Sequence, residues 1–158
     1  MRILKWLGVA LGVGVVVLGL LFALRTDPVF MISGKRLSGE ELPAPADWSV
    51  CYDHMTIAVE SRVDDPHSVT TLCFVHDGDL IIPAQDAGEK EWPAYVVADP
   101  RVRLKFGETV YPAHAERIMD IPWVAVLASI EAKYPQAAAR FDANSPPEDV
   151  WMFRVSPR

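Results

Sequence analysis

The hydrophobic pattern changes character along the 158 residues of the chain. Residues 6–24 form an unbroken apolar run, whereas residues 48–158 hold short apolar runs that turn signals separate. The clearest of these short runs is 101–106, in which apolar and cationic residues alternate. Strict alternation predicts an antiparallel strand with one buried face and, here, a cationic outer face.

Glycine-containing turns indicate where neighbouring strands pair. Asp77-Gly78 lies between the apolar runs 72–75 and 80–82, and Asp-Gly is a strong hairpin signal because type I′ turns need positive φ angles. Gly107-Glu108 separates 101–106 from 109–118 in the same way. Further strands are predicted at 48–53, 56–62 and 150–155.

Two regions have helical patterns. Residues 89–98 predict one short helix, which Asp99-Pro100 ends because the residue before a proline avoids the helical region. In 122–141, large apolar residues recur at helical spacing. Pro135 predicts a break that separates a second short helix. We interpret this region as a helical cover for one end of the β domain.

The run from Trp6 to Leu24 predicts one N-terminal transmembrane helix, because about 20 apolar residues cross a bilayer. Arg2 and Lys5 precede it, so the positive-inside rule predicts a single-pass membrane protein with a cytoplasmic N-terminus. The domain would then lie on the outer side, periplasmic or extracellular. A cleaved signal peptide is the alternative interpretation. The predicted organisation is an anchor at 1–27, a tether at 28–47 and a folded domain at 48–158.

One stretch carries a family resemblance. Its residues are Trp92, Val96 to Pro100, Val102, Leu104, Gly107, Tyr111 and Ala115. In this spacing they resemble the deazaflavin-dependent nitroreductase family and, more broadly, the pyridoxamine-phosphate-oxidase-like split barrels. The resemblance implies a mainly β fold with helices (α+β), a split β-barrel, behind the predicted transmembrane helix. It also implies a flavin or deazaflavin cofactor, haem in some members, and a homodimer.

The same resemblance suggests a set of cofactor-binding residues. The family's anion-binding loop falls at 61–68, which here reads SRVDDPHS, and Asp64 and Asp65 would repel a phosphate. Tyr95 stands where the family has asparagine. Trp92 and Tyr95 are three residues apart on one helix, so they can wall a flat ring together. The residues predicted to bind the cofactor are Arg62, His67, Ser68, Thr70, Lys90, Trp92 and Tyr95.

Other chemistry has little support in the sequence, and no catalytic residue is predicted. Cys51 and His54 have ligand spacing but lack evident partners for a zinc site. The chain has no G-x-S-x-G elbow, no P-loop and no G-x-G-x-x-G fingerprint. Its net charge of −6 argues against nucleic-acid binding, which needs a basic surface. Noncovalent haem would have four candidate ligands, His54, His67, His76 and His114.

The two cysteines, Cys51 and Cys73, predict a disulfide if the domain lies outside the cytoplasm, where such bonds persist. The alternative is a pair of buried thiols that act as small apolar residues.

Two functional hypotheses follow. The first is a membrane-anchored oxidoreductase whose flavin, deazaflavin or haem acts on a small molecule. The second is a noncatalytic binding or assembly module of the same fold that has lost the cofactor.

Overall fold

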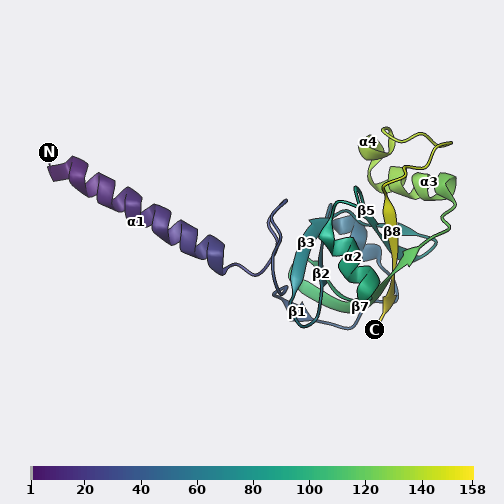
Figure 1. Cartoon of the computed structure of the whole chain (residues 1–158), viewed down its shortest axis with the longest axis horizontal. Coiled ribbons are helices and arrows are strands. Elements are labelled where there is room, and N and C mark those ends of the chain that lie inside the picture. The colour runs from purple at the N-terminus through teal and green to yellow at the C-terminus, as the bar shows by residue number, and fades with distance from the viewer. Residues whose placement is uncertain (1) are drawn as a thin grey trace.

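A computed structural model describes residues 2–158; within the first helix it leaves out the side chains of 2–5, 7–10 and 21. The strands form one eight-stranded sheet that curls into a half-barrel (Figure 1). Seven strands pair antiparallel in the order β3-β2-β6-β7-β8-β5-β4, and β1 pairs parallel with β7. The strands are β1 (Glu40–Glu41), β2 (Ile57–Ser61), β3 (His67–Thr71), β4 (Phe74–His76), β5 (Asp79–Ala84), β6 (Arg101–Phe106), β7 (Thr109–Ile118) and β8 (Trp151–Pro157).

The helices lie around this sheet. Figure 1 shows α2 beside the curled strands, α3 and α4 together at one end of the sheet, and α1 projecting away from it. The helices are α1 (Arg2–Leu24), the 3₁₀ helix η1 (Ser49–Asp53), α2 (Glu91–Ala98), α3 (Trp123–Lys133) and α4 (Pro135–Ala138). The predicted break at Pro135 is confirmed, because α4 begins there.

The predicted transmembrane helix is contradicted. The apolar run does form α1, but among the described residues no helix is both long and apolar enough to span a bilayer, which takes about 20 apolar residues. The longest unbroken stretch of α1 whose side chains are described is 11–20. The predicted fold class is therefore corrected to an α+β half-barrel without this element. The single-pass localisation, with its cytoplasmic N-terminus and outer domain, depended on the same helix and is wrong with it.

The hairpin predictions are confirmed. β6 and β7 occupy the predicted ranges, and their register pairs Phe106 with Thr109 around Gly107, which has a φ of 57°. Asp77 and Gly78 have φ angles of 52° and 87° between β4 and β5. Two successive left-handed residues are what a type I′ turn requires, so this local signal is sufficient to place the turn.

The strand predicted at 48–53 is wrong. Ser49–Asp53 is the 3₁₀ helix η1, because local hydrogen bonds compete with strand pairing. The Asp47 Oδ1 accepts a hydrogen bond from the backbone N–H of Ser49 at 2.9 Å. The N–H of Cys51 donates to the carbonyl of Trp48, also at 2.9 Å, which tightens the turn.

The buried residues form two clusters. The barrel core fills the inside of the sheet and extends beneath α2, where Trp92 packs on Phe153 with ring centroids 5.5 Å apart. The second cluster lies between the sheet and the helices α3 and α4. It consists of Phe74, Ile81, Trp123, Val126, Ile130, Tyr134, Ala138 and Met152. Burial of these two apolar faces is the main force that holds the helices against the sheet.

The cationic outer face of β6 is paired with carboxylates. Arg103 lies 2.6 Å from the buried Glu60 and 3.1 Å from Glu41. Lys105 lies 2.7 Å from Asp27. These ion pairs join the segment before β2 to the barrel. The predicted division into 1–27, 28–47 and 48–158 stays a prediction.

Candidate functional site

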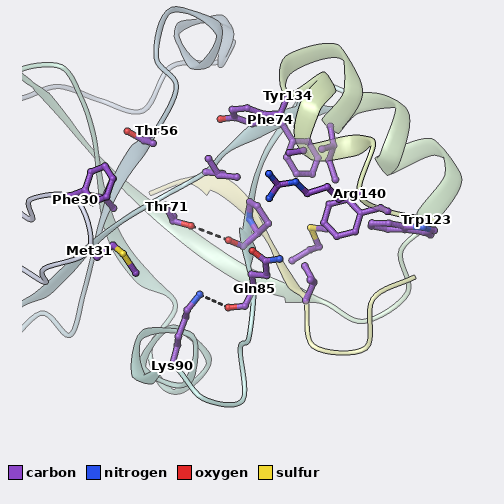
Figure 2. Close-up of a pocket in the computed structure, with 18 residues that line it drawn as sticks. Phe30, Met31, Thr56, Thr71, Phe74, Gln85, Lys90, Trp123, Tyr134 and Arg140 are labelled. Carbon is purple, nitrogen blue, oxygen red and sulfur yellow. Dashed lines mark hydrogen bonds between the residues drawn. The ribbon is translucent and has the colours of Figure 1, made fainter. Parts of the chain in front are cut away.

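A cleft opens between the barrel and the two C-terminal helices (Figure 2). Its main cavity has a volume of about 540 Å³. A second hollow of about 300 Å³ adjoins it along α2. The two hollows share the side chains of Phe30, Met31, Thr70, Thr71 and Lys90. We call this continuous space the cleft, its β3–α2 side the barrel wall, and its α3–α4 side the helical wall.

The helical wall is mainly aromatic and apolar. Trp123 and Phe141 meet edge to face with ring centroids 5.5 Å apart, and the Trp123 indole N–H donates to the carbonyl of Asp142 at 2.9 Å. Tyr134 lines the cleft one turn beyond Ile130. Because each large ring is held by packing or a hydrogen bond, this wall is a fixed surface on which a flat apolar group can lie.

Two cations lie at the cleft. Figure 2 shows Arg140 pointing from the helical wall toward the middle of the cleft, and Lys90 on the opposite side. The Lys90 Nζ donates to the carbonyl of Gln85 at 2.5 Å and lies 3.9 Å from an Asp86 carboxylate oxygen. Facing cations across an apolar cavity favour a ligand with an anionic group.

Four of the seven predicted binding residues line the cleft. Thr70 and Lys90 border both hollows. His67 and Trp92 line the smaller one. Trp92 is only 6% exposed because its other face packs in the barrel core. The structure therefore brings together residues from β3 and α2 that the sequence separates by more than twenty positions.

Arg62 and Tyr95 lie beside the cleft but do not border it. The Arg62 guanidinium lies over the Tyr95 ring, 4.4 Å from its centroid, and pairs with Asp65 at 2.7 Å. His67 contacts the same Tyr95 ring edge to face at 5.6 Å. The charge of Arg62 is thus paired within the loop.

Ser68 is fully buried on β3 and does not border the cleft either. Its backbone exchanges two hydrogen bonds with Gly34, at 2.8 and 3.1 Å. The Ser68 hydroxyl has no hydrogen-bond partner among the described residues. A direct contact between this hydroxyl and a ligand in the cleft has no geometric support.

His67 differs from the other three histidines because it lines the cleft. Burial, reinforced by the nearby charge of Arg62, lowers the pKa of its imidazole below the ordinary value. The ring is therefore neutral at neutral pH, which is the form that ligates metals. By contrast, His76 bonds Ser129 at 2.9 Å, and His54 packs on Phe106.

The sequence did not indicate two parts of the cleft. One is the pair Phe30 and Met31, which are 85% and 90% exposed at the tip of a short bridge. The other is the helical wall. Its helical spacing was visible in the sequence, but the pattern was interpreted as a cover for the barrel end. Nothing in the pattern distinguishes a cover from the wall of a cleft, and Arg140 had no signal at all.

Comparisons with known proteins place the fold. No protein-family model matches the chain, and no curated protein matches it. Among solved structures, it is similar to a Listeria innocua protein assigned to the pyridoxamine 5′-phosphate oxidases, at 17% identity and a TM-score of 0.50. That match covers 69% of this chain and 88% of the other.

Two further solved structures have the same fold. One is the F420-H2-dependent reductase FDR-A, at 15% identity and a TM-score of 0.50, with 77% of this chain and 100% of the other covered. The other is the haem storage protein HutZ of Vibrio cholerae, at 12% identity and a TM-score of 0.51, with 69% and 85% covered. The fold neighbours are thus pyridoxamine-phosphate-oxidase-like split barrels, which confirms the resemblance at the level of the fold.

Proposed function

We propose that this chain binds a flat, anionic redox cofactor of the flavin or deazaflavin type in the cleft, and with it transfers hydride or electrons to a small acceptor. The observation that carries the proposal is the pairing of an aromatic, apolar cavity with two cations, Lys90 and Arg140, on opposite sides. The solved structures support it through what their own names say they use or bind, F420-H2 for one and haem for another.

The size and lining of the cleft fit such a group. Its main cavity of about 540 Å³ lies within the usual range of roughly 300–1,000 Å³ for small-molecule sites. Apolar rings with a few well-placed polar groups are the typical lining of these sites. Phe74 and Met152 extend the apolar surface between the two walls.

The lining residues would have different tasks. Lys90 and Arg140 would bind the anionic part of the cofactor, and Thr70 would offer it a hydroxyl. Trp123 and Tyr134 would cover the ring and exclude water from it. When bound, a flavin or deazaflavin supplies the hydride or electron transfer itself. The chain's residues supply position and electrostatics.

Haem is a second candidate, and a specific residue favours it. His67 borders the smaller hollow, and its lowered pKa keeps it neutral, which is the form in which histidine would ligate the haem iron. Trp92 lines the same hollow and would offer the haem an apolar contact. His54, His76 and His114 do not border the cleft.

A noncatalytic binding module remains the alternative function, and the 61–68 loop supports it. Arg62 is paired with Asp65 and packed on Tyr95, so this loop presents no unpaired cation to a phosphate. A split barrel that has lost its cofactor could keep the cleft for another apolar ligand.

The visible absorption spectrum of the full chain tests these functions. We expect an absorption band characteristic of a flavin, a deazaflavin or a haem, either as purified or after incubation with each cofactor and desalting. The chromophore belongs to the cofactor, so a band shows binding directly. If no cofactor is retained after any of the three incubations, the proposal fails and the noncatalytic module is favoured.

The homodimer implied by the resemblance is also part of the proposal. Cofactor sites of this fold family are implied to lie at the subunit interface, and the exposed Phe30 and Met31 at the cleft are apolar groups that a second subunit could cover. Light scattering of the full chain across micromolar concentrations checks it, and a monomer throughout would contradict it.

A further inference from the structure

The two cysteines are 22 positions apart in the sequence but lie next to each other in the fold. Their Sγ atoms lie 3.3 Å apart, and both residues are free thiols with no exposed surface. Cys51 comes from η1, and Cys73 from the short link between β3 and β4. The sulfur atoms are close, but the predicted disulfide is not formed in this structure, and Cys51 lies in a 3₁₀ helix instead of the strand predicted at 48–53.

A lysine contacts both sulfur atoms. Lys133, at the end of α3, places its Nζ 3.0 Å from the Cys51 Sγ and 3.4 Å from the Cys73 Sγ. The same ammonium donates to the carbonyl of Cys73 at 2.7 Å. An ammonium beside a thiol stabilises the thiolate, which is the nucleophilic form of cysteine.

Tyr134, which follows Lys133 in the chain, holds the backbone of Cys73 in place. The Tyr134 hydroxyl lies 2.9 Å from the carbonyl of Cys73 and 2.7 Å from that of Met55. The N–H of Cys73 points to the same hydroxyl at 3.4 Å. Cys73 is thus held in place, while Cys51 lies on a short 3₁₀ turn, an element with poorer hydrogen-bond geometry.

The two sulfur atoms differ electrostatically. The hydrogen bond from Cys73, together with Lys133 and against the effect of burial, lowers the pKa of Cys51 to about 7. The hydrogen bond to Cys51 and burial raise the pKa of the Cys73 thiol. A low-pKa nucleophile next to a protonated thiol is the arrangement typical of a reactive cysteine with a resolving partner.

We propose that Cys51 and Cys73 form a redox-active dithiol that a small hydroperoxide converts to a reversible disulfide, with Lys133 as the residue that positions the reactive thiolate. The thiolate of Cys51 attacks one peroxide oxygen. The O–O bond breaks, Cys51 becomes a sulfenic acid, and the other oxygen leaves as an alcohol or water after taking a proton.

The second step closes the disulfide. The sulfur of Cys73 attacks the sulfur of Cys51, the S–O bond breaks, and hydroxide leaves with the proton of Cys73 as water. Two electrons and two thiol hydrogens have then passed to the peroxide. An external dithiol restores both thiols by exchange. Because neither cysteine is exposed, the oxidant must be small and must enter through local opening of η1.

Lys133 separates this proposal from simple burial of two small side chains. Two thiols that only fill space would need no charge beside them, and taking a lysine out of water is unfavourable without partners. Lys133 is half-buried, and its ammonium contacts both sulfur atoms and the backbone carbonyl of Cys73, with the Tyr134 ring centroid 4.9 Å away.

The test treats the folded full chain with hydrogen peroxide, removes the oxidant, and then measures the intact mass after thiol alkylation in denaturant, which exposes both buried cysteines. We expect two alkylatable thiols before oxidation and none afterwards. The oxidised chain should be lighter by two hydrogens than the reduced, unalkylated chain. Dithiothreitol should restore both thiols. Cys73→Ser should leave a sulfenic acid on Cys51 that dimedone captures. If both thiols of the folded wild-type chain stay alkylatable after peroxide, the proposal is overturned.

The role of Lys133 needs its own variants. Lys133→Met should slow oxidation at pH 7 by about three- to tenfold and move the pH midpoint of the rate upward, because less of Cys51 is then thiolate. The pKa of Cys51 should stay partly lowered in this variant, because the hydrogen bond from Cys73 persists. Lys133→Arg keeps the charge and should keep most of the rate. Equal rates and pH profiles in all three proteins would overturn the role of Lys133, and the cysteine variants test the dithiol even if Lys133→Met fails to fold.

Discussion

The two walls of the cleft are built in different ways. The barrel wall, with Thr70 and Trp92, is the surface of the main core and rests on the fully buried Phe153. The helical wall rests on the second cluster, which joins the sheet through Phe74 and Met152. The barrel wall is therefore set by the split-barrel fold itself, whereas the helical wall depends on how this chain packs its C-terminal helices. We infer that the barrel wall determines where the cleft lies, and that the helical wall determines which flat ring would fit in it.

The largest expected effect comes from the core beneath the barrel wall. Phe153→Ala removes a ring with no exposed surface that packs on Trp92. A large-to-small change at such a site costs about 3–5 kcal/mol of the free energy of unfolding, which is a large part of the stability of a small domain. Urea unfolding of the full chain measures it. A loss below about 1 kcal/mol would mean that the barrel wall is not a rigid base.

A smaller effect is expected in the helical wall. Ile130→Ala removes a side chain that lines the cleft and is 7% exposed. We expect a loss of about 2 kcal/mol, at the low end for this change, because the space left behind joins the open cleft instead of forming a closed cavity. Val124→Ala on the same helix is the control, since Val124 is 66% exposed and should change stability little. Equal losses in Ile130→Ala and Phe153→Ala would remove the contrast between the walls.

The smallest effect concerns the surface turn that joins α2 of the barrel wall to β6. The hydrogen bond from Arg101 holds the pKa of Asp99 at about 2, below its ordinary value of 3.8. Since the pKa is depressed in the folded state, the stabilisation is present above about pH 4 and is lost as the pH falls toward 2. The pair is largely exposed and screened by water, so its contribution to stability is small.

Unfolding of Asp99→Asn at pH 5 and pH 2 measures this contribution. The variant should be slightly less stable than the wild type at pH 5, and the difference should vanish at pH 2. Asp120→Asn is a matched control at an exposed carboxylate. A difference between Asp99→Asn and the wild type that grows toward pH 2 would contradict the assignment.

Much of the barrel could be predicted because its signals are local. The alternation in 101–106 and the turns at Gly78 and Gly107 each depend on a few neighbouring residues, and all three are as predicted. The segment 48–53 failed for a reason that is also local, since Asp47 caps a turn where apolar residues suggested a strand. The pattern of apolar residues alone cannot show whether strand pairing or a local turn dominates in such a segment.

The site could be predicted only in part. His67, Thr70, Lys90 and Trp92 were predicted because the family resemblance suggested binding residues on the barrel wall. Arg140 and the rings of the helical wall were missed, because their place follows from tertiary packing of α3 and α4 onto Phe74 and Met152. The same holds for Lys133, whose contact with the two cysteines spans 60 and 82 residues of sequence.

The central claim is that the cleft binds an anionic, flat cofactor between Lys90 and Arg140, and a fluorescence titration with flavin mononucleotide, deazaflavin and haemin tests it most directly. We expect the wild-type chain to bind one of the three, and the Lys90→Ala/Arg140→Ala double variant to bind it at least about tenfold more weakly, because two charge-assisted contacts are lost. Lys35→Ala, an exposed lysine outside the cleft, should bind as the wild type does. Equal affinities of the double variant and the wild type, or no binding of any of the three cofactors, would contradict the claim.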